Sequence, residues 1–212
     1  MIRAEKTDLR RKAGQRTQDG LQTAALELLA HRGQEGVTLR EITDRAGVNV
    51  AAVSYHFGSL KALCETTIEH ALERYLDAQL LELNALGSTA ALDDLAAAFA
   101  RPMMRALAAC GQDLAMMRTM ARVCINPPQR WGRLDSKFDQ SRRGAVRVLA
   151  PNLPGVDEQE LIFRTRCAAG LLNWLALSPI GTELAAMSAE QIERQLVPVV
   201  AGTFRGNATA AR

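Results

Sequence analysis

Small and polar side chains gather in one short stretch, Thr38 to Lys61, in an order suited to hydrogen bonding with nucleic acid. A short helix is predicted inside this stretch, and its outward positions carry no bulky aliphatic group. These positions are Asn49, Ala51, Ser54 and Tyr55. A helix that lies against base edges in the major groove needs such a surface. The chemistry that this pattern predicts is non-covalent recognition of DNA.

Groups able to bind phosphate flank this surface. Tyr55 and His56 can donate hydrogen bonds to phosphate oxygens, and Arg40 and Lys61 can neutralise phosphates on either side. Taken singly, each of them is equally typical of a solvated charge or a half-buried aromatic. It is their combination with the helix signals around them that favours the DNA-binding interpretation.

Those signals describe a helix, a turn and a second helix. Thr38 and Glu41 form a capping box that starts the first helix, and Gly47 supplies the left-handed backbone that ends it. Apolar side chains recur where the two helices must pack on each other and on a preceding helix, with the small Thr43 at their close approach. The apolar positions are Ile42, Val48, Val53 and Phe57.

The rest of the 212 residues also favours helices, because Ala and Leu are abundant and only 4% of residues are aromatic. We predict an all-α fold of nine helices without strands. Their ranges are about 17–32, 38–46, 50–57, 59–86, 89–110, 113–125, 130–149, 157–177 and 188–204. Two loops are expected at Pro151–Gly155 and Ser178–Gly181, since both contain proline and glycine. No apolar run is long enough for a membrane span or a signal peptide. The four cysteines are scattered and form no CxxC pair, so a cytoplasmic, reduced protein is expected.

The net charge of +3 is unevenly placed. The first sixteen residues carry six basic side chains against Glu5 and Asp8. This pattern is typical of a flexible tail, and it also suits a basic arm that touches phosphates or the minor groove.

The segment GVTLREITDRAGVNVAAVSYHFGSLKAL, residues 36–63, resembles the DNA-binding domain of the TetR family of bacterial transcriptional repressors. The resemblance extends over about residues 17–75. It implies DNA contacts at Thr38, Arg40, Asn49, Val50, Ala51, Ser54, Tyr55, His56 and Lys61. Two positions depart from the family pattern, because Ser54 stands where leucine is frequent and Leu60 stands where lysine is usual.

The resemblance also implies an architecture. A basic arm (1–16) precedes a three-helix DNA-binding domain with a helix-turn-helix (17–58). A long connecting helix then opens a helical ligand-binding and dimerisation domain (59–205), and a short tail (206–212) follows. Such a protein would bind a palindromic DNA operator as a homodimer and respond to a small-molecule effector, without cofactor, metal or membrane.

Side chains for the dimer contact are expected on the last two long helices. The helix at 157–177 is nearly apolar all round, so neighbours must cover every side of it. A second subunit could cover the side that its own chain leaves open, in a four-helix contact about a two-fold axis. The residues assigned to it are Leu161, Leu171, Leu175, Ile192, Leu196 and Val199.

Flexible apolar side chains in the middle of the chain could line a ligand pocket, although they equally fit an ordinary core. The residues assigned to the pocket are Phe99, Met103, Leu107, Met117, Met120, Phe138, Leu171 and Trp174. Arg118 and Arg122 could hold an anionic head group. The segment from Pro151 weakly resembles the family branch that senses fatty acyl compounds, which implies an apolar or acyl-type effector.

Enzymatic chemistry is disfavoured, because the only histidines, His31, His56 and His70, lie in the first third of the chain. No catalytic or metal-binding residue is assigned. Two alternatives remain: a regulator that responds to oxidation of Cys110, Cys124 and Cys167, or a helical interaction protein that binds no operator.

Overall fold

A computed structural model describes residues 2–87, 89–109, 111–125 and 132–206, and these form ten α-helices and two 3₁₀ helices. The elements are α1 (Ile2–Arg32), η1 (Gln34–Gly36), α2 (Leu39–Ala46), α3 (Ala51–Phe57), α4 (Leu60–Ala85), α5 (Leu92–Ala109), α6 (Gly111–Ile125), η2 (Gly132–Leu134), α7 (Asp135–Asn152), α8 (Glu158–Leu177), α9 (Pro179–Ala185) and α10 (Ala189–Arg205). Cys110 and the tail from residue 207 lie outside the described residues. The all-helical prediction is confirmed. None of the described helices is long and apolar enough to cross a lipid bilayer.

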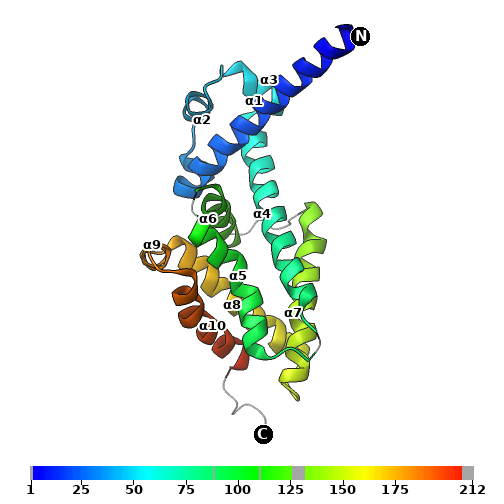
Figure 1. Cartoon of the computed structure of the whole chain (residues 1–212), viewed down its shortest axis with the longest axis vertical. Coiled ribbons are helices and arrows are strands. Elements are labelled where there is room, and N and C mark those ends of the chain that lie inside the picture. Colours follow the sequence, from blue (N-terminus) through cyan, green and yellow to red (C-terminus); the bar gives the residue numbers. More distant parts are fainter. Residues whose placement is uncertain (1, 88, 110, 126–131, 207–212) are drawn as a thin grey trace.

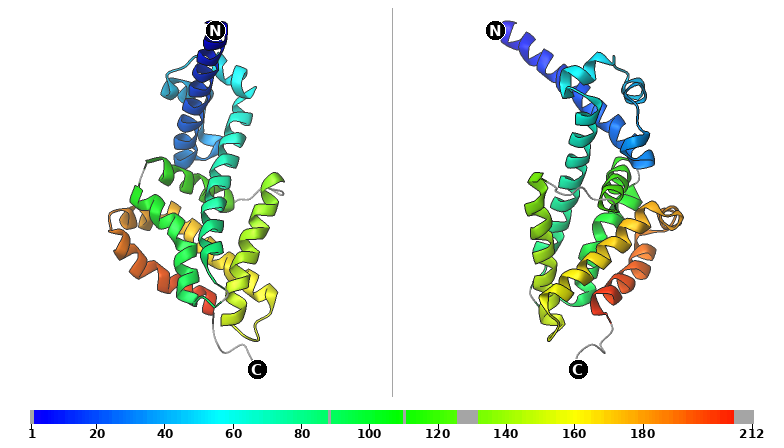
Figure 2. Two further views of the ribbon diagram at one scale, coloured as in Figure 1. Left: turned by 45° about the vertical axis from the view of Figure 1, so that its right-hand side comes forward. Right: turned by 180° about the vertical axis from the view of Figure 1, so that it is seen from behind.

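The helices form two groups joined by α4. Helices α1–α3 make up one end of the molecule, and α5–α10 make up the other, where α5, α6 and α7 pack on α4 (Figure 1). Helix α6 lies between the groups, because it packs on both α1 and α8. Seen from behind, α8 runs beside α10 (Figure 2).

Each group has its own apolar core. The smaller core joins side chains of α1–α4, including Leu21, Ile42, Val53 and Leu63. The larger core fills the space between α4 and α5–α10. Ile68 of α4 packs against both cores, so α4 is a structural part of each group and not only a linker between them.

The predicted helix starts are confirmed at their caps. Thr38 and Glu41 form a reciprocal capping box, and so do Ser188 and Gln191 at the start of α10. Asp157 accepts the Glu160 amide hydrogen at the start of α8. Gly47 ends α2 in the left-handed conformation, at φ 66°. These signals are local, and for that reason the sequence identifies them.

Several helix boundaries differ from the predictions. Helix α1 begins at Ile2 and not at Thr17, and Asp8 pairs with Lys12 one turn later, as solvated helices often do. Pro151 was predicted to lie in a loop, but it lies in the last turn of α7, where Asn152 donates to the carbonyls of Val148 and Ala90. The predicted break at Ser178 instead opens α9, because Pro179 occupies the first helical position, where its missing N–H costs no hydrogen bond.

The capping box at Thr38 gives a testable pH dependence. Hydrogen bonds from the Thr38 hydroxyl, from Arg32 and from the Thr38 amide lower the pKa of Glu41 from 4.5 to about 2. Because the folded pKa is depressed, the stabilisation by this carboxylate is complete above its ordinary pKa and is lost as the pH falls toward 2. We expect the melting temperatures of the wild type and Glu41→Gln to differ by a constant amount above about pH 5 and to converge toward pH 2.

Glutamine preserves the capping-box geometry, so this comparison isolates the charge. Thermal melts followed by circular dichroism over this pH range measure the difference. Curves that stay parallel down to pH 2 would contradict the assignment.

Candidate nucleic-acid interface

The helix-turn-helix of α2 and α3 is held by a small, tightly packed core. Ile42 and Thr43 of α2 and Val53 of α3 are buried against α1 and the first turns of α4. The Thr43 hydroxyl donates to the carbonyls of Leu39 and Arg40, so this buried polar group is satisfied within its own helix. The positions predicted to pack inward therefore do so. They fix the surface that α3 turns outward.

The predicted contact residues share this outer surface. Eight of them are exposed, and His56 is half-buried. The exposed residues are Thr38, Arg40, Asn49, Val50, Ala51, Ser54, Tyr55 and Lys61. They come from the start of α2, from α3 and from the start of α4, which meet at one end of the molecule (Figure 1).

Two of these residues also shape the local backbone. The Asn49 carbonyl oxygen Oδ1 accepts the Ala51 amide hydrogen at 2.8 Å and so starts α3. Thr38 caps α2 through its hydroxyl. Their first role is to set the orientation of the helices, and any contact with DNA adds to that role.

Tyr55 is the most prominent group on this surface, with 85% of its area exposed. Its ring meets His56 edge-on, with ring centroids 4.9 Å apart. A side chain added at Gly14 of α1 would lie 3.8 Å from the His56 ring, which places α1 directly beside the end of α3. The N-terminal part of α1 extends outward past α3. Arg11, Lys12 and Arg16 in this part of the helix are exposed.

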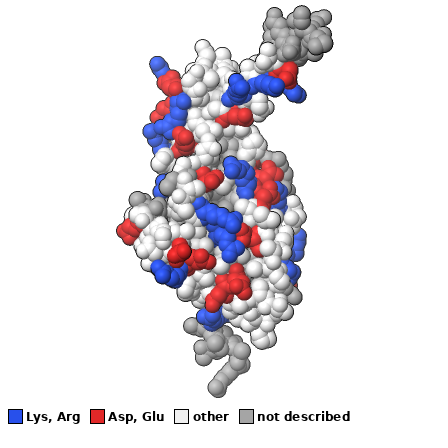
Figure 3. Space-filling view, in the orientation of Figure 1, with Lys and Arg blue, Asp and Glu red and all other residues white. Residues whose placement is uncertain are grey.

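The flanking basic residues are only loosely paired. Arg40 lies 3.8 Å from Asp44, and Lys61 lies 3.8 Å from Glu65, with all four side chains mostly exposed. Surface pairs of this kind contribute little energy and exchange readily for other partners. Basic side chains are visible over α1 and α2 at this end, with acidic ones among them (Figure 3).

The residues assigned to a ligand pocket lie on α5, α6, α7 and α8. Most of them are buried in the larger core, where Phe99 meets Phe204 edge-on at a centroid distance of 5.5 Å. The buried residues are Phe99, Met103, Leu107, Met117 and Met120, with Phe138 and Leu171 half-buried beside them. Trp174 is instead 51% exposed. Side chains from α4, α5, α6 and α8 fill the space between them, and the pocket assignment stays a prediction.

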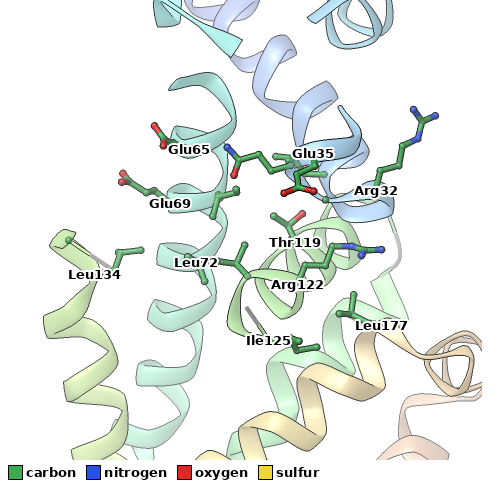
Figure 4. A pocket seen from close by; sticks show the side chains of 16 residues that line it. Arg32, Glu35, Glu65, Glu69, Leu72, Thr119, Arg122, Ile125, Leu134 and Leu177 are labelled. Atoms are coloured by element: carbon green, nitrogen blue, oxygen red, sulfur yellow. The ribbon is translucent and has the colours of Figure 1, made fainter. Parts of the chain in front are cut away.

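A groove of about 1170 Å³ lies elsewhere, between α1, α4 and α6. Apolar and charged side chains both line it (Figure 4). The lining side chains include Leu29, Arg32, Glu35, Glu65, Ile68, Glu69, Leu72, Thr119, Arg122, Val123, Ile125, Leu134 and Leu177. The groove thus touches both groups of helices. Of the two arginines predicted to hold an anion, Arg122 lines it, and its guanidinium donates to backbone carbonyls of α1.

Most residues assigned to a dimer contact pack inside the single chain, and their part in a dimer stays a prediction. Leu161, Leu175, Ile192 and Leu196 are buried in the core of the single chain, and Leu171 is half-buried. Only Val199 is on the surface, with 54% of its area exposed. Apolar spacing identified both helices, but it selected the sides that α8 and α10 turn toward α5 and toward each other.

A different stripe of α8 is open to solvent. Phe163, Cys167, Gly170 and Trp174 are spaced by four, three and four residues, so they follow one side of the helix. Phe163 is 60% exposed. The neighbouring α10 also exposes Pro198, Val199 and Gly202. We call these seven residues the α8–α10 face.

The cysteines give limited support to redox sensing. Burial raises the pKa of Cys124 to about 12, and it also raises the pKa of Cys64, which lies in the smaller core. A thiol reacts through its thiolate, so both are poor sensors at neutral pH. Cys167 is exposed on α8.

Comparisons with known proteins agree with this architecture. The family model described as "Bacterial regulatory proteins, tetR family" matches residues 21–66, and "Tetracyclin repressor-like, C-terminal domain" matches residues 97–203. Among curated proteins, no sequence matches the chain.

Solved structures share the fold at low sequence identity. PfmR from Thermus thermophilus, a TetR family transcriptional regulator, has a TM-score of 0.63 and 19% identity over 85% of this chain and 96% of its own. The ketosteroid transcriptional regulator KstR2 of Mycobacterium tuberculosis has a TM-score of 0.58 and 20% identity, over 87% and 93%. The fatty acid degradation regulator FadR from Bacillus halodurans has a TM-score of 0.54 and 15% identity, over 91% and 96%.

Proposed function

The chain belongs to the TetR family of bacterial regulatory proteins, and from that membership we propose that it is a homodimeric repressor, released from a palindromic operator by a small apolar molecule. Membership by itself makes the chain a DNA-binding transcriptional regulator and not an enzyme. The dimer, the repression and the effector are the proposed parts. Because its partner is DNA, we expect the protein to act in the cytoplasm.

The observation that carries the proposal is the surface of α3. It presents small and polar groups and one large aromatic, Tyr55, while Val53 on the opposite side is buried. A helix held so firmly on one side and so open on the other is suited to enter a major groove. Arg40 and Lys61 flank it at the starts of α2 and α4, where phosphates would lie.

The α8–α10 face supports the dimer. Exposed aromatic side chains such as those on this face are unfavourable in water, and contact with a second subunit would bury them. The small residues beside them would allow two helices to approach closely. A two-fold axis through this face would bring α8 and α10 of each subunit into a four-helix contact. Two copies of α3 could then reach half-sites about 34–36 Å apart, or a multiple of one DNA turn.

The groove between α1, α4 and α6 supports the site of the effector. It is large enough to hold a drug-sized molecule, and it touches both α1 and the larger core. Its lining favours an apolar body. An acidic head group has less support, because Arg122 is engaged with backbone carbonyls and Glu35, Glu65 and Glu69 also line the groove.

Selection from a random pool of duplex DNA tests the proposal. We expect the purified protein to enrich a palindrome and to bind it at least about 1000-fold more tightly than bulk DNA, with two chains per site. Mass photometry of the complex gives the stoichiometry. Enrichment of no sequence over bulk DNA would favour the helical interaction protein instead. Release of operator by peroxide, prevented by Cys167→Ser, would favour the redox regulator.

A further inference from the structure

The seam between α1 and α6 is held by one strong polar contact. The Arg122 guanidinium of α6 donates from Nε to the Ala30 carbonyl at 3.0 Å and from Nη2 to the His31 carbonyl at 2.8 Å. Both carbonyls belong to the last turn of α1. Arg122 of α6 therefore binds the end of α1. It links the regulatory group of helices (α5–α10) to the DNA-reading group (α1–α3).

The chemistry of this contact makes it directional. The last carbonyls of an α-helix have no partner within the helix, and the helix dipole places partial negative charge there. A guanidinium is planar and always charged, and its fork can serve two neighbouring acceptors at once. The two bonds thus fix the angle of α1 relative to α6 as well as their separation.

Other polar contacts along the seam are weaker. The Thr119 hydroxyl lies 3.5 Å from the Leu26 carbonyl, and Gln112 Nε2 lies 3.3 Å from the Thr23 hydroxyl. Both distances are long for hydrogen bonds, and neither contact involves a charged group. Arg122 is accordingly the strongest polar link between α1 and α6 that the described residues provide.

The angle of α1 determines where α3 lies. Leu21, Leu28 and Leu29 of α1 share a core with Val53 of α3, so the two helices move as one body. In a dimer, a small rotation of each body would change the separation of the two copies of α3.

We propose that Arg122 is the positioning residue that sets the angle of the DNA-reading helices on the regulatory helices, and with it the half-site spacing that the dimer accepts. Arg122 also lines the groove together with Arg32 and Gly33 from the end of α1. A small molecule bound in the groove would lie beside Arg122 and the end of α1. The residue is thus placed to transmit occupancy to α3. This inference rests on the proposed function for its operator readout, but its geometric readout needs no DNA.

The first test compares operators. For Arg122→Gln, we expect about tenfold weaker binding to the native operator, whereas an operator with one extra central base pair should lose much less affinity. The preference of the wild type for the native spacing should therefore flatten. Arg122→Lys keeps the charge but lacks the fork, so it should restore part of that preference. Arg118→Gln, one turn earlier on α6, is the matched control and should behave as wild type.

The ratio of the affinities for the two operators distinguishes a positioning role of Arg122 from an effect on folding. A variant that is merely less stable lowers the active concentration equally for both operators and leaves their ratio unchanged. An unchanged ratio in Arg122→Gln would overturn the inference.

The second test measures the angle without DNA. Spin labels at Ala51→Cys on α3 and Glu190→Cys on α10 report the distance between the two groups by pulsed electron resonance. Cys110 and Cys167 are replaced by serine, and labelled protein is diluted with excess unlabelled chain. We expect a broader or shifted distance distribution in Arg122→Gln, whereas Arg118→Gln should give the distribution of the wild type. If the wild type binds no operator, the proposed function fails while this measurement still decides the role of Arg122, and identical distributions in the wild type and Arg122→Gln would refute it.

Discussion

Replacing Trp174 with glutamate is expected to separate the dimer into single chains and to weaken operator binding by about 100-fold or more. Trp174 is half-exposed in the single chain and stands in line with Phe163 on the α8–α10 face. A two-fold axis brings each substitution into the contact twice, and an unpaired charge in an apolar contact is strongly unfavourable. Once the link is lost, each half-site must bind its own chain independently. The advantage of joined binding, about 10²–10⁴, then disappears.

Sedimentation velocity gives the oligomeric state, and fluorescence anisotropy with labelled operator gives the affinity. The matched control is Leu81→Glu, since Leu81 is 70% exposed on α4 and lies outside the α8–α10 face. The control should remain dimeric and bind normally. A Trp174→Glu protein that stays dimeric at micromolar concentration would show that the two chains meet elsewhere.

The sequence predicted the features that depend on a few neighbouring residues. The capping box at Thr38, the glycine turn at Gly47 and the cap at Asp157 all act within four residues. The outward surface of α3 follows from them, because helical spacing leaves only one side free once Val53 is buried. The family model of the N-terminal domain matches residues 21–66, which contain the local pattern at Thr38 and Gly47.

Which side of an apolar helix faces the chain's own core could not be predicted. Helix α8 is apolar on several sides, so composition alone does not separate Leu161, which is buried, from Phe163, which is exposed. Trp174 was placed in a pocket for the same reason. Burial depends on neighbours far away in the sequence, and in this chain those are α5 and α10.

A second feature without a local signal is the use of arginine at the ends of other helices. Arg122 binds the end of α1, Arg147 donates to the Leu83 and Leu86 carbonyls at the end of α4, and Arg164 donates to the Phe204 and Arg205 carbonyls at the end of α10. Each arginine is distant in sequence from the carbonyls that it binds. The sequence does not separate Arg164, which is buried, from Arg166 of the same helix, which is exposed.

Replacing Tyr55 with alanine is expected to weaken operator binding by about 30- to 150-fold and to leave the melting temperature nearly unchanged. The first effect follows from symmetry. A lost hydrogen bond with its surrounding contact costs about 1–1.5 kcal/mol, and the dimer loses it twice, for a total of about 2–3 kcal/mol. The second effect follows from exposure, because a side chain with 85% of its area in solvent contributes little to the folded state.

Tyr55→Phe separates the two parts of this contact, since it removes the hydroxyl and keeps the ring against His56. If the hydroxyl binds a phosphate, Phe should weaken the operator and bulk DNA alike, and the salt dependence should change little because no charge is removed. If the ring instead contacts a base, Phe should bind as the wild type does, while Ala loses affinity for the operator alone. Anisotropy titrations with both DNAs distinguish these outcomes. Normal operator affinity in Tyr55→Ala would mean that α3 does not present this side to the groove, and the surface assigned to DNA would have to be moved.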